Sequence, residues 1–175
     1  MSKCAVVVIL AAGEGTRMKS KKPKVMHKVC GYPIIEYVVR TAAEISESLP
    51  VTVVGHKAEE IRQYLGQRVR YAYQSQQLGT GHAVMIAQPF FEKIDGYAVV
   101  VAGDTPLIRS CTLQQMINYA YEGRYDAVTL SAVLDDPTGY GRIIRNEAGD
   151  LERVVEQKDA TEEQRRIKEV NVSAY

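Results

Sequence analysis

Cysteine is scarce in this sequence, and its few copies are not paired. The 175 residues contain three, Cys4, Cys30 and Cys111, and no two of them form a CxxC pattern. An odd number of widely spaced cysteines argues against a disulfide framework and against a zinc site. Free thiols are typical of proteins in a reducing compartment, so we expect a cytoplasmic location.

Long apolar runs are missing as well. The longest near the N-terminus covers residues 5–12, far short of the roughly 20 residues that span a bilayer. One lysine precedes this run, and no small-residue cleavage pattern follows it. The sequence therefore predicts neither a secretion signal nor a membrane partner.

The chain also has little net charge. It carries 22 Lys and Arg against 21 Asp and Glu, a formal charge of +1, which argues against a general nucleic-acid or membrane binder. Hydrophobic residues make up 46% and charged residues 25%. These values are typical of a globular protein and exclude global disorder, and the length fits one domain.

What the sequence does contain is an alternation of apolar strands and amphipathic helices. The continuous apolar runs 4–10 and 97–102 are typical of strands buried on both faces of a parallel sheet. Further strands are expected at 51–54, 69–73 and 126–134, and helices at 33–48, 57–65, 80–88 and 112–121, the last closed by Gly123. This β-α-β-α-β-α-β order predicts a Rossmann-like, three-layer α/β fold, with a mostly parallel sheet covered by helices on both faces.

The pattern changes after residue 135. Residues 140–145 and 151–156 flank a turn at 146–149 and predict a hairpin. A short polar helix is expected at 160–167, and a strand from 170 to the last residue. Because no stop signal or polar tail precedes that end, we expect a truncated chain whose sheet is incomplete at the C-terminus.

A glycine-rich loop, residues 10–18, follows the first strand. It matches neither GxxxxGK[ST] nor GxGxxG, because Met18 stands where either pattern needs glycine. Taken alone, the loop could be a plain turn. However, residues 17–28 hold six Lys and Arg and no acid, whereas acids outnumber bases in the rest of the chain. Successive amides and cations at the end of a parallel strand indicate a polyanion, and a triphosphate fits better than duplex DNA.

Asp104 follows the second buried strand, residues 97–102. A carboxylate at that position can hold Mg²⁺, a hard cation that arrives together with phosphates. The alternative is that Asp104 caps the helix that comes next. The neighbouring phosphate loop favours the metal interpretation.

Several segments together resemble a known family. Residues 10–18 and 24–27 resemble the signature of sugar-phosphate nucleotidyltransferases. The segments 77–83 (Gln-Leu-Gly-Thr-Gly-His-Ala), 103–107, 139–143 and 155–159 narrow the resemblance. They are similar to the uridyltransferase domain of the bacterial bifunctional N-acetylglucosamine-1-phosphate uridyltransferases/glucosamine-1-phosphate acetyltransferases, which make UDP-N-acetylglucosamine. The matches run in family order from residue 10 to about residue 171, and the 77–83 segment is the most specific.

The resemblance implies a role for individual residues on the nucleotide side. UTP phosphates would be held by Leu10, Ala11, Ala12, Gly13 and the two catalytic cations Arg17 and Lys24. Uracil would be recognised by Gln74, Gly79 and Thr80. The side-chain amide of Gln74 offers both a donor and an acceptor, which matches the imide edge of uracil. Asp104 would be a ligand of the Mg²⁺ cofactor.

On the sugar side, the resemblance implies that N-acetylglucosamine-1-phosphate is held by Gly141, Glu156 and Asn171. A single nucleotidyltransferase domain is then expected, with residues 1–134 as its nucleotide-binding part and 135–175 as the start of its sugar-binding part. Two features depart from the family pattern. Ala102 stands where some members carry Tyr, and Val172-Ser173 stands where Thr-Gly is usual. The second Mg²⁺ ligand, an Asn, and the acetyltransferase domain that trimerises these enzymes would lie beyond residue 175.

Three other functions stay open at this point. One is another sugar-1-phosphate nucleotidyltransferase, for example of thymidylyl type, which the 77–83 segment disfavours. A second is a nucleotide-binding fragment without turnover, and the abrupt end of the chain favours it. The third is an RNA-binding module, which only the basic stretch supports.

Overall fold

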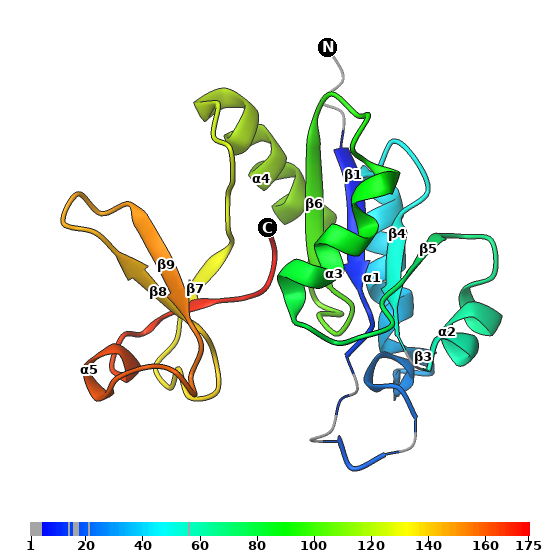
Figure 1. Cartoon of the computed structure of the whole chain (residues 1–175), viewed down its shortest axis with the longest axis horizontal. Helices are drawn as coiled ribbons and strands as arrows, with labels where there is room; N and C mark the ends of the chain where they lie inside the picture. The colour runs from blue at the N-terminus through cyan, green and yellow to red at the C-terminus, as the bar shows by residue number, and fades with distance from the viewer. Residues whose placement is uncertain (1–4, 14, 16–17, 21, 56) are drawn as a thin grey trace. The chain divides into compact units, whose positions relative to one another are not determined.

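The computed structural model describes residues 5–13, 15, 18–20, 22–55 and 57–175. The chain divides into two compact units, Met1–Asp126 and Ala127–Tyr175. The division lies eight residues before the boundary expected at 134/135. Each unit has a sheet of its own (Figure 1).

The first unit is built on a four-stranded parallel sheet in the order β5-β4-β1-β6. Its strands are β1 (Ala5–Leu10), β4 (Val51–Val54), β5 (Arg70–Tyr73) and β6 (Tyr97–Ala102). β1 is central and pairs with β6 along its whole length. Its residues are almost all buried, which is why the sequence there is a continuous apolar run rather than an alternating one.

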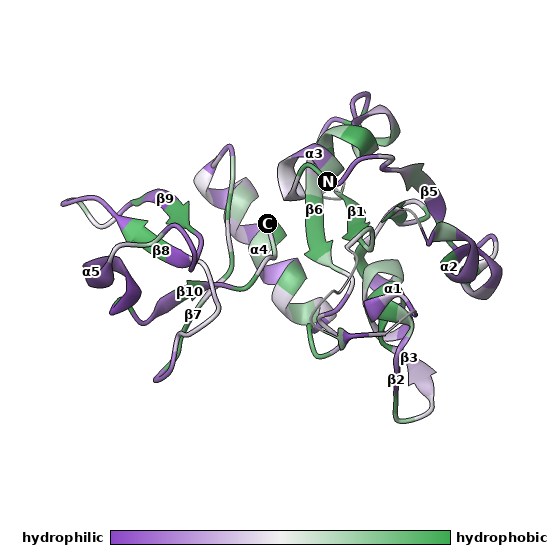
Figure 2. Cartoon of the chain, turned by 60° about the horizontal axis from the view of Figure 1, so that its bottom comes forward, coloured by the Kyte–Doolittle hydropathy of each residue, from purple (hydrophilic) through white to green (hydrophobic). Residues whose placement is uncertain are grey.

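Helices cover both faces of this sheet. They are α1 (Ile34–Ile45), α2 (Ala58–Leu65), α3 (Thr80–Ala87) and α4 (Ser110–Gly123). α1 packs on β1 and on α4, whereas α3 packs on β1 and β4 from the opposite face, with α3 in front of the sheet and α1 behind it in Figure 1. The apolar strands contrast with the hydrophilic α2 in Figure 2. The predicted α/β fold is therefore confirmed for this unit.

A buried carboxylate joins α1 to the end of α2. Glu36 is 3% exposed, and it accepts hydrogen bonds from Arg68 Nη1 and Nη2 at 3.0 and 2.9 Å and from Arg40 Nε at 2.8 Å. The bidentate Arg68 hydrogen bonds hold the pKa of Glu36 below its ordinary value, against the opposing effect of burial. This network fixes the position of α2 against α1.

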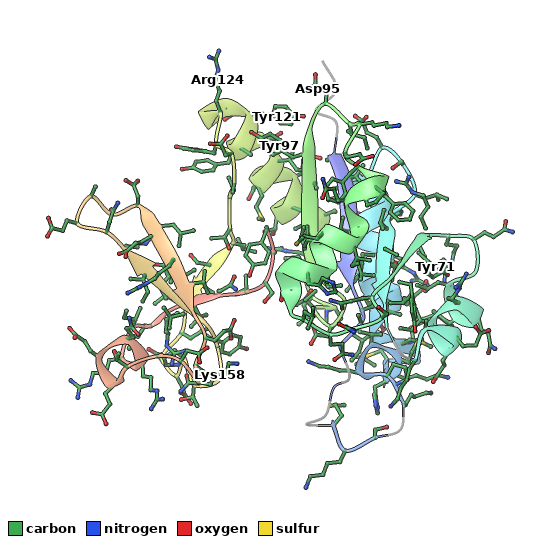
Figure 3. The ribbon with its side chains drawn as sticks, in the orientation of Figure 1. Tyr71, Asp95, Tyr97, Tyr121, Arg124 and Lys158 are labelled. Atoms are coloured by element: carbon green, nitrogen blue, oxygen red, sulfur yellow. The ribbon has the colours of Figure 1, made fainter. Side chains whose placement is uncertain are left out.

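The end of α4 differs from the expectation. The helix continues through Gly123, and Arg124 adopts the left-handed conformation with φ 52°. A side chain at Gly123 would overlap the ring of Tyr125, so this glycine serves close packing and not the helix-ending turn. Near the same end, Tyr97 of β6 meets Tyr121 of α4 edge to face, with ring centroids 4.8 Å apart (Figure 3).

Several short elements in the first unit escaped sequence analysis. A small hairpin pairs β2 (Lys28–Val29) with β3 (Tyr32–Pro33). Cys30 and Gly31 form its turn with φ values of 48° and 89°. Positive φ at both central residues is the geometry of tight hairpin turns. The 3-10 helices η2 (Lys24–Met26) and η3 (Gln88–Phe90) were also not expected.

The second unit is an antiparallel sheet in the order β7-β10-β8-β9. Its elements are β7 (Ser131–Val133), β8 (Arg142–Arg145), β9 (Leu151–Val155), the short helix α5 (Glu162–Arg165) and β10 (Glu169–Asn171). The predicted hairpin at 140–156 is confirmed as β8 and β9. Thr161 and Gln164 form a capping box at the start of α5.

One predicted strand belongs to a different sheet from the one expected. The 126–134 segment was expected to extend the parallel sheet, but only Ser131–Val133 is a strand, and it pairs antiparallel with β10. The apolar pattern identified a strand without revealing its partner, because the pairing depends on residues 169–171, about 40 positions later. Among the described residues, no helix combines the length and apolarity needed to cross a membrane.

Candidate active site

The loop after β1 lies at the point where the order of the strands in the sheet reverses. β4 and β6 flank β1 on its two sides, so the chain adds β4 and β5 on one side of β1 and then returns to add β6 on the other. Ligands of open α/β sheets bind at such a switch point, outside the carboxyl ends of the strands. The predicted phosphate loop, residues 10–13, and the predicted metal ligand Asp104 both lie at this edge of the sheet.

The backbone of the loop is held from both sides. Ala11 N donates to Val53 O at 2.8 Å, and Gly103 N donates to Leu10 O at 2.8 Å. Ala11 and Ala12 are buried, whereas Gly13 is exposed. The sheet hydrogen bonding therefore continues past the end of β1 and presents Gly13 to solvent at its tip.

Two glycines let neighbouring strands approach this loop closely. A Cβ on Gly55 would lie 2.9 Å from Ala12 O, and a Cβ on Gly103 would lie 2.9 Å from Leu10 O. Either side chain would displace the loop backbone, because the obstructing atom is a carbonyl oxygen and not a flexible side-chain end. The sequence analysis did not single out Gly55 at all.

Lys24 and Asp104 lie together. Lys24 Nζ forms an ion pair with Asp104 Oδ2 across 80 positions of sequence. Buried Val25 and Met26 anchor the short η2 helix that begins at Lys24. The residue expected to hold phosphates and the residue expected to hold Mg²⁺ are thus partners of one another. The other expected cation, Arg17, lies outside the described residues.

Asp104 does not cap the next helix. α4 begins at Ser110 with Arg109 as its N-cap residue, and the Arg109 side chain makes no capping hydrogen bond. The carboxylate is instead partly exposed beside Lys24. Among the described residues, no three His, Cys, Asp or Glu side chains form a group that could hold a metal ion. A single carboxylate suits Mg²⁺, which commonly takes one or two protein carboxylates and completes its shell with phosphates and water.

The three residues expected to recognise uracil also lie together. Gln74 follows β5 and is 4% exposed. Its Nε2 donates to Gly79 O at 3.3 Å and lies 3.0 Å from His82 Nδ1. Gly79 is the N-cap residue of α3, with φ 99°, and Thr80 is the first residue of that helix.

These contacts change what Gln74 can offer to a ligand. If His82 carries its hydrogen on Nε2, its Nδ1 accepts from Gln74 Nε2, and both hydrogens of that nitrogen are then used within the chain. The remaining group of this side chain is the acceptor Oε1. The recognition of uracil by a donor and an acceptor of Gln74 stays a prediction, and with this tautomer of His82 the group left for a ligand is Oε1.

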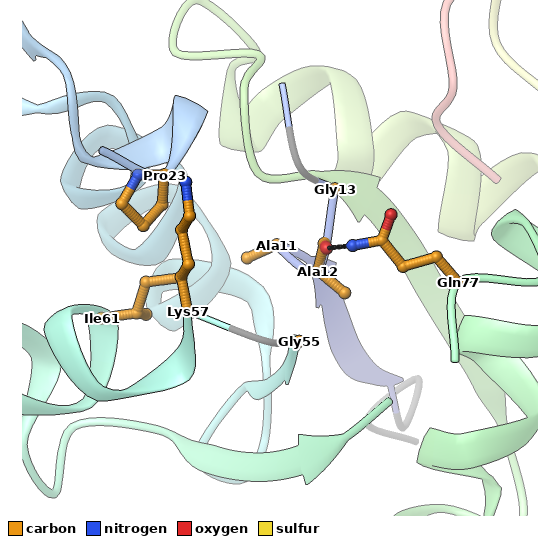
Figure 4. A pocket seen from close by; sticks show the side chains of 8 residues that line it. All are labelled: Ala11, Ala12, Gly13, Pro23, Gly55, Lys57, Ile61 and Gln77. Carbon is orange, nitrogen blue, oxygen red and sulfur yellow. Dashed lines mark hydrogen bonds between the residues drawn. The ribbon is translucent and has the colours of Figure 1, made fainter. Parts of the chain in front are cut away.

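A small pocket adjoins the loop (Figure 4). Its lining comprises Ala11, Ala12, Gly13, Pro23, Gly55, Lys57, Ile61 and Gln77, and its volume is about 30 Å³. Gln77 Nε2 donates to Ala12 O at 2.6 Å. This volume is far too small to hold a nucleotide. Sequence analysis missed Gly55, Lys57 and Gln77 as residues of this region, although Gln77 opens the most specific of the family segments.

Within the second unit, the three residues expected to hold the sugar converge. A Cβ on Gly141 would lie 3.4 Å from Glu156 Oε1, and Asn171 N donates to Gly141 O at 2.8 Å. Glu156 is exposed, whereas Asn171 is 7% exposed. Asn171 Oδ1 accepts from Ser173 N at 3.1 Å, and Ser173 has φ 57° at the position where the resembled family has glycine.

A buried arginine supports this cluster. Arg142 is 1% exposed and donates to Tyr140 O, to Gln157 Oε1 at 2.7 Å and to Arg165 O at 3.2 Å. Gln157 Oε1 also accepts from Gly139 N at 3.2 Å. Arg142 thus joins the loop before β8 to the segment that carries Glu156. Sequence analysis recognised Arg142 as part of a motif but assigned it no role.

Comparison with known proteins places these observations in a family. Residues 7–168 match the model of the MobA-like NTP transferase domain. The bifunctional protein GlmU of Thermoanaerobacter pseudethanolicus is 54% identical over 170 residues, which are 97% of this chain and 37% of that protein. GlmU of Bacillus subtilis is 50% identical over 168 residues, 96% of this chain and 37% of the relative. The chain thus spans little more than a third of the length of these relatives.

Solved structures show the same fold. UDP-glucose pyrophosphorylase complexed with UDP-glucose superposes with a TM-score of 0.73 at 19% identity, over 98% of this chain and 75% of that one. A putative glucose-1-phosphate thymidylyltransferase from Bacillus anthracis gives a TM-score of 0.68, also at 19% identity, over 98% and 70%. The sequence matches, the parallel sheet and the loop at its switch point lead to one conclusion: this chain belongs to the MobA-like NTP transferase domain family.

Proposed function

We propose that the chain binds UTP with Mg²⁺ and transfers its uridylyl group to N-acetylglucosamine-1-phosphate, giving UDP-N-acetylglucosamine and pyrophosphate. The observation that carries this proposal is the meeting of the 10–13 loop, Lys24 and Asp104 at one switch point. The resemblance of the 77–83 segment to uridyltransferases and the 54% identity to a GlmU protein support the choice of nucleotide and sugar.

The reaction needs no covalent enzyme intermediate. An oxygen of the sugar phosphate attacks the α-phosphorus of UTP, a new P–O bond forms, and the bond to the bridging oxygen breaks as pyrophosphate leaves. Catalysis then consists of alignment and of stabilising the charge that develops on the phosphates. Backbone amides of the loop and the ammonium of Lys24 would supply that stabilisation, together with Arg17.

The chemistry of Asp104 fits a magnesium ion that arrives with the nucleotide. When bound, such an ion would neutralise charge on the phosphates and help align them. Asp104 would contribute one carboxylate oxygen to it. Lys24 and Asp104 form an ion pair with each other. On binding of the nucleotide, Lys24 would instead pair with a phosphate and Asp104 with the magnesium ion.

Gln74 would distinguish uracil from cytosine by its acceptor. Uracil carries a hydrogen on N3, whereas cytosine presents a lone pair there. An amide whose Nε2 hydrogens are already engaged by Gly79 O and His82 Nδ1 can accept from uracil N3 and would repel cytosine N3. With cytosine bound, Gln74 Oε1 would face the N3 lone pair without a hydrogen to accept, and this should favour uracil strongly.

Gly141, Glu156 and Asn171 would hold the sugar. Exposed Glu156 can accept from sugar hydroxyls, and Gly141 lies beside it, where a Cβ would be 3.4 Å from Glu156 Oε1. The runner-up is a thymidylyl-type enzyme, which the shared fold with a putative thymidylyltransferase keeps open. A nucleotide-binding protein without turnover is the non-catalytic alternative. A cytoplasmic location stays a prediction.

Pyrophosphate release by the purified chain tests the proposal. The assay combines UTP or dTTP with N-acetylglucosamine-1-phosphate or glucose-1-phosphate, with Mg²⁺ or with excess chelator. We expect release that requires UTP, the N-acetylated sugar and the metal, and that Asp104→Asn reduces at least a hundredfold. Faster release with dTTP would favour the runner-up. Binding of UTP without any release would support the non-catalytic alternative.

A further inference from the structure

Gln77 joins two segments that the proposed function uses for different parts of the nucleotide. It stands between β5 and α3, in the stretch expected to recognise the base. Its Nε2 donates to Ala12 O at 2.6 Å, across 65 positions of sequence, in the loop expected to hold the phosphates. Figure 4 shows this hydrogen bond as the link between the two segments.

The accepting carbonyl belongs to the peptide unit that ends in Gly13 N–H. In a planar trans peptide the C=O and N–H bonds point in opposite directions. A donor that fixes Ala12 O on the Gln77 side therefore fixes Gly13 N–H on the other side. The hydrogen bond from Gln77 to Ala12 O therefore also fixes the direction of Gly13 N–H, one of the amides expected to bind phosphate.

This peptide unit needs such control because the residue after it is glycine. Gly13 is exposed, and a Cβ placed on it would meet no atom within 4 Å. Gly13 has no side chain that would restrict its own φ and ψ, so on this side little opposes a rotation that turns the Ala12 carbonyl outward. An outward carbonyl would place a partial negative charge where phosphate oxygens are expected.

We propose that Gln77 is a positioning residue that keeps the Ala12–Gly13 peptide oriented for phosphate binding and couples the base-recognising segment to the phosphate loop. This inference takes the identity of the nucleotide from the proposed function. The effect of Gln77 on phosphate binding does not depend on which nucleotide binds. Gln77 is not proposed to touch the reacting groups. It would act by orienting the N–H of Gly13.

The test compares Gln77→Met with Gln76→Met. Methionine is close to glutamine in length and is also uncharged, so it removes the side-chain amide, and with it the donor to Ala12 O, while largely keeping the size of the side chain. Gln76 is the exposed neighbour of Gln77, which makes its variant a matched control. Titration calorimetry in the presence of Mg²⁺ measures the dissociation constants for UTP and for inorganic tripolyphosphate, and a thermal melt without ligand measures stability.

We expect Gln77→Met to weaken binding of both UTP and tripolyphosphate about five- to tenfold, with a melting temperature close to that of the unchanged chain. Gln76→Met should bind both as the unchanged chain does. Equal affinities for Gln77→Met and the unchanged chain would overturn the positioning role while leaving the proposed function intact. A lower melting temperature with unchanged affinity would show a purely structural tie and would also overturn it.

The tripolyphosphate arm separates this inference from the proposed function. If the unchanged chain binds tripolyphosphate but shows no preference for UTP, the nucleotide assignment fails, and the loss in Gln77→Met still supports the positioning role. If the unchanged chain binds neither compound, both proposals are overturned.

Discussion

At the residue scale, the site depends on two glycines as much as on its polar side chains. Gly55 and Gly103 stand on either side of the loop after β1, and each would place a Cβ 2.9 Å from a loop carbonyl. Among the polar contacts, Gln77 donates to Ala12 O in the loop, and Lys24 pairs with Asp104, the residue after Gly103. The loop is therefore set by backbone packing first and by charge second.

Replacing Gly103 by alanine tests that order. We expect Gly103→Ala to lower the free energy of unfolding by about 1–3 kcal/mol, because the added carbon must move Leu10 O or its own strand. Urea unfolding measures the loss. The control is Gly81→Ala in α3, where a Cβ meets nothing within 4 Å and alanine should be neutral or stabilising. Equal stabilities of the two variants would contradict the close approach.

At the element scale, α1 and the end of α2 are joined by a carboxylate whose effect depends on pH. The pKa of Glu36 is lowered from 4.5, chiefly by the hydrogen bonds from Arg68. A carboxyl whose pKa is lower in the folded than in the unfolded chain stabilises the fold above its unfolded pKa. That contribution is lost as the pH falls below about 4.5 and through the folded pKa.

Glu36→Gln should therefore destabilise the chain in a pH-dependent way. At pH 7 we expect a loss of about 1–3 kcal/mol, the range for hydrogen bonds to charged groups. At pH 3 the difference from the unchanged chain should shrink. Urea unfolding at the two pH values measures it, with Glu44→Gln as the control because Glu44 is exposed on the same helix. A difference that stays constant with pH would contradict the assigned ion pairing.

The end of α4 offers a second test at this scale. Arg124 has φ 52° at the left-handed position after the helix, a conformation that is unfavourable for any residue with a Cβ. We expect Arg124→Gly to stabilise the chain by about 0.5–1 kcal/mol in urea unfolding. Arg124→Ala keeps the Cβ and should bring no such gain. If the alanine variant gained as much as the glycine variant, the backbone would not be the cause.

The elements show how far sequence reasoning reaches. β4 and β6 lie where the apolar runs placed them, because a strand buried on both faces needs a continuous apolar run. Gly123 was misassigned because a glycine near a helix end can serve either a turn or close packing, and only the position of Tyr125 decides. The β7 segment was recognised as a strand but placed in the wrong sheet, because its partner lies in residues 169–171.

For the candidate site as well, the sequence predicts some residues and misses others. Strand ends identify the loop at 10–13 and Asp104, because the carboxyl ends of parallel strands share one edge. The Lys24–Asp104 pair, the bond from Gln77 to Ala12 O and the support that Arg142 gives through Gln157 all join residues distant in sequence. No local pattern predicts such contacts, which is why Gln77 and Arg142 had no assigned role.

At the scale of the whole molecule, the residues proposed to hold the phosphates and the base lie in the first unit, and those proposed to hold the sugar lie in the second. Residues 10–13, 24, 74–80 and 104 belong to Met1–Asp126, and residues 141, 156 and 171 belong to Ala127–Tyr175. Nucleotide binding should therefore stabilise the first unit even without the sugar phosphate. A ligand at about 100 times its dissociation constant adds about 2.7 kcal/mol to the stability of the state that binds it.

The most direct measurement is thermal unfolding of the chain with Mg²⁺ and each of UTP, CTP, dTTP and GTP in turn. We expect a clear rise in the melting temperature with UTP and a much smaller one with CTP, because Gln74 Oε1 is proposed to accept from uracil N3. Equal shifts with UTP and CTP would contradict the base assignment. A cooperative transition that no nucleotide shifts would contradict the central claim that this loop is a preformed triphosphate site.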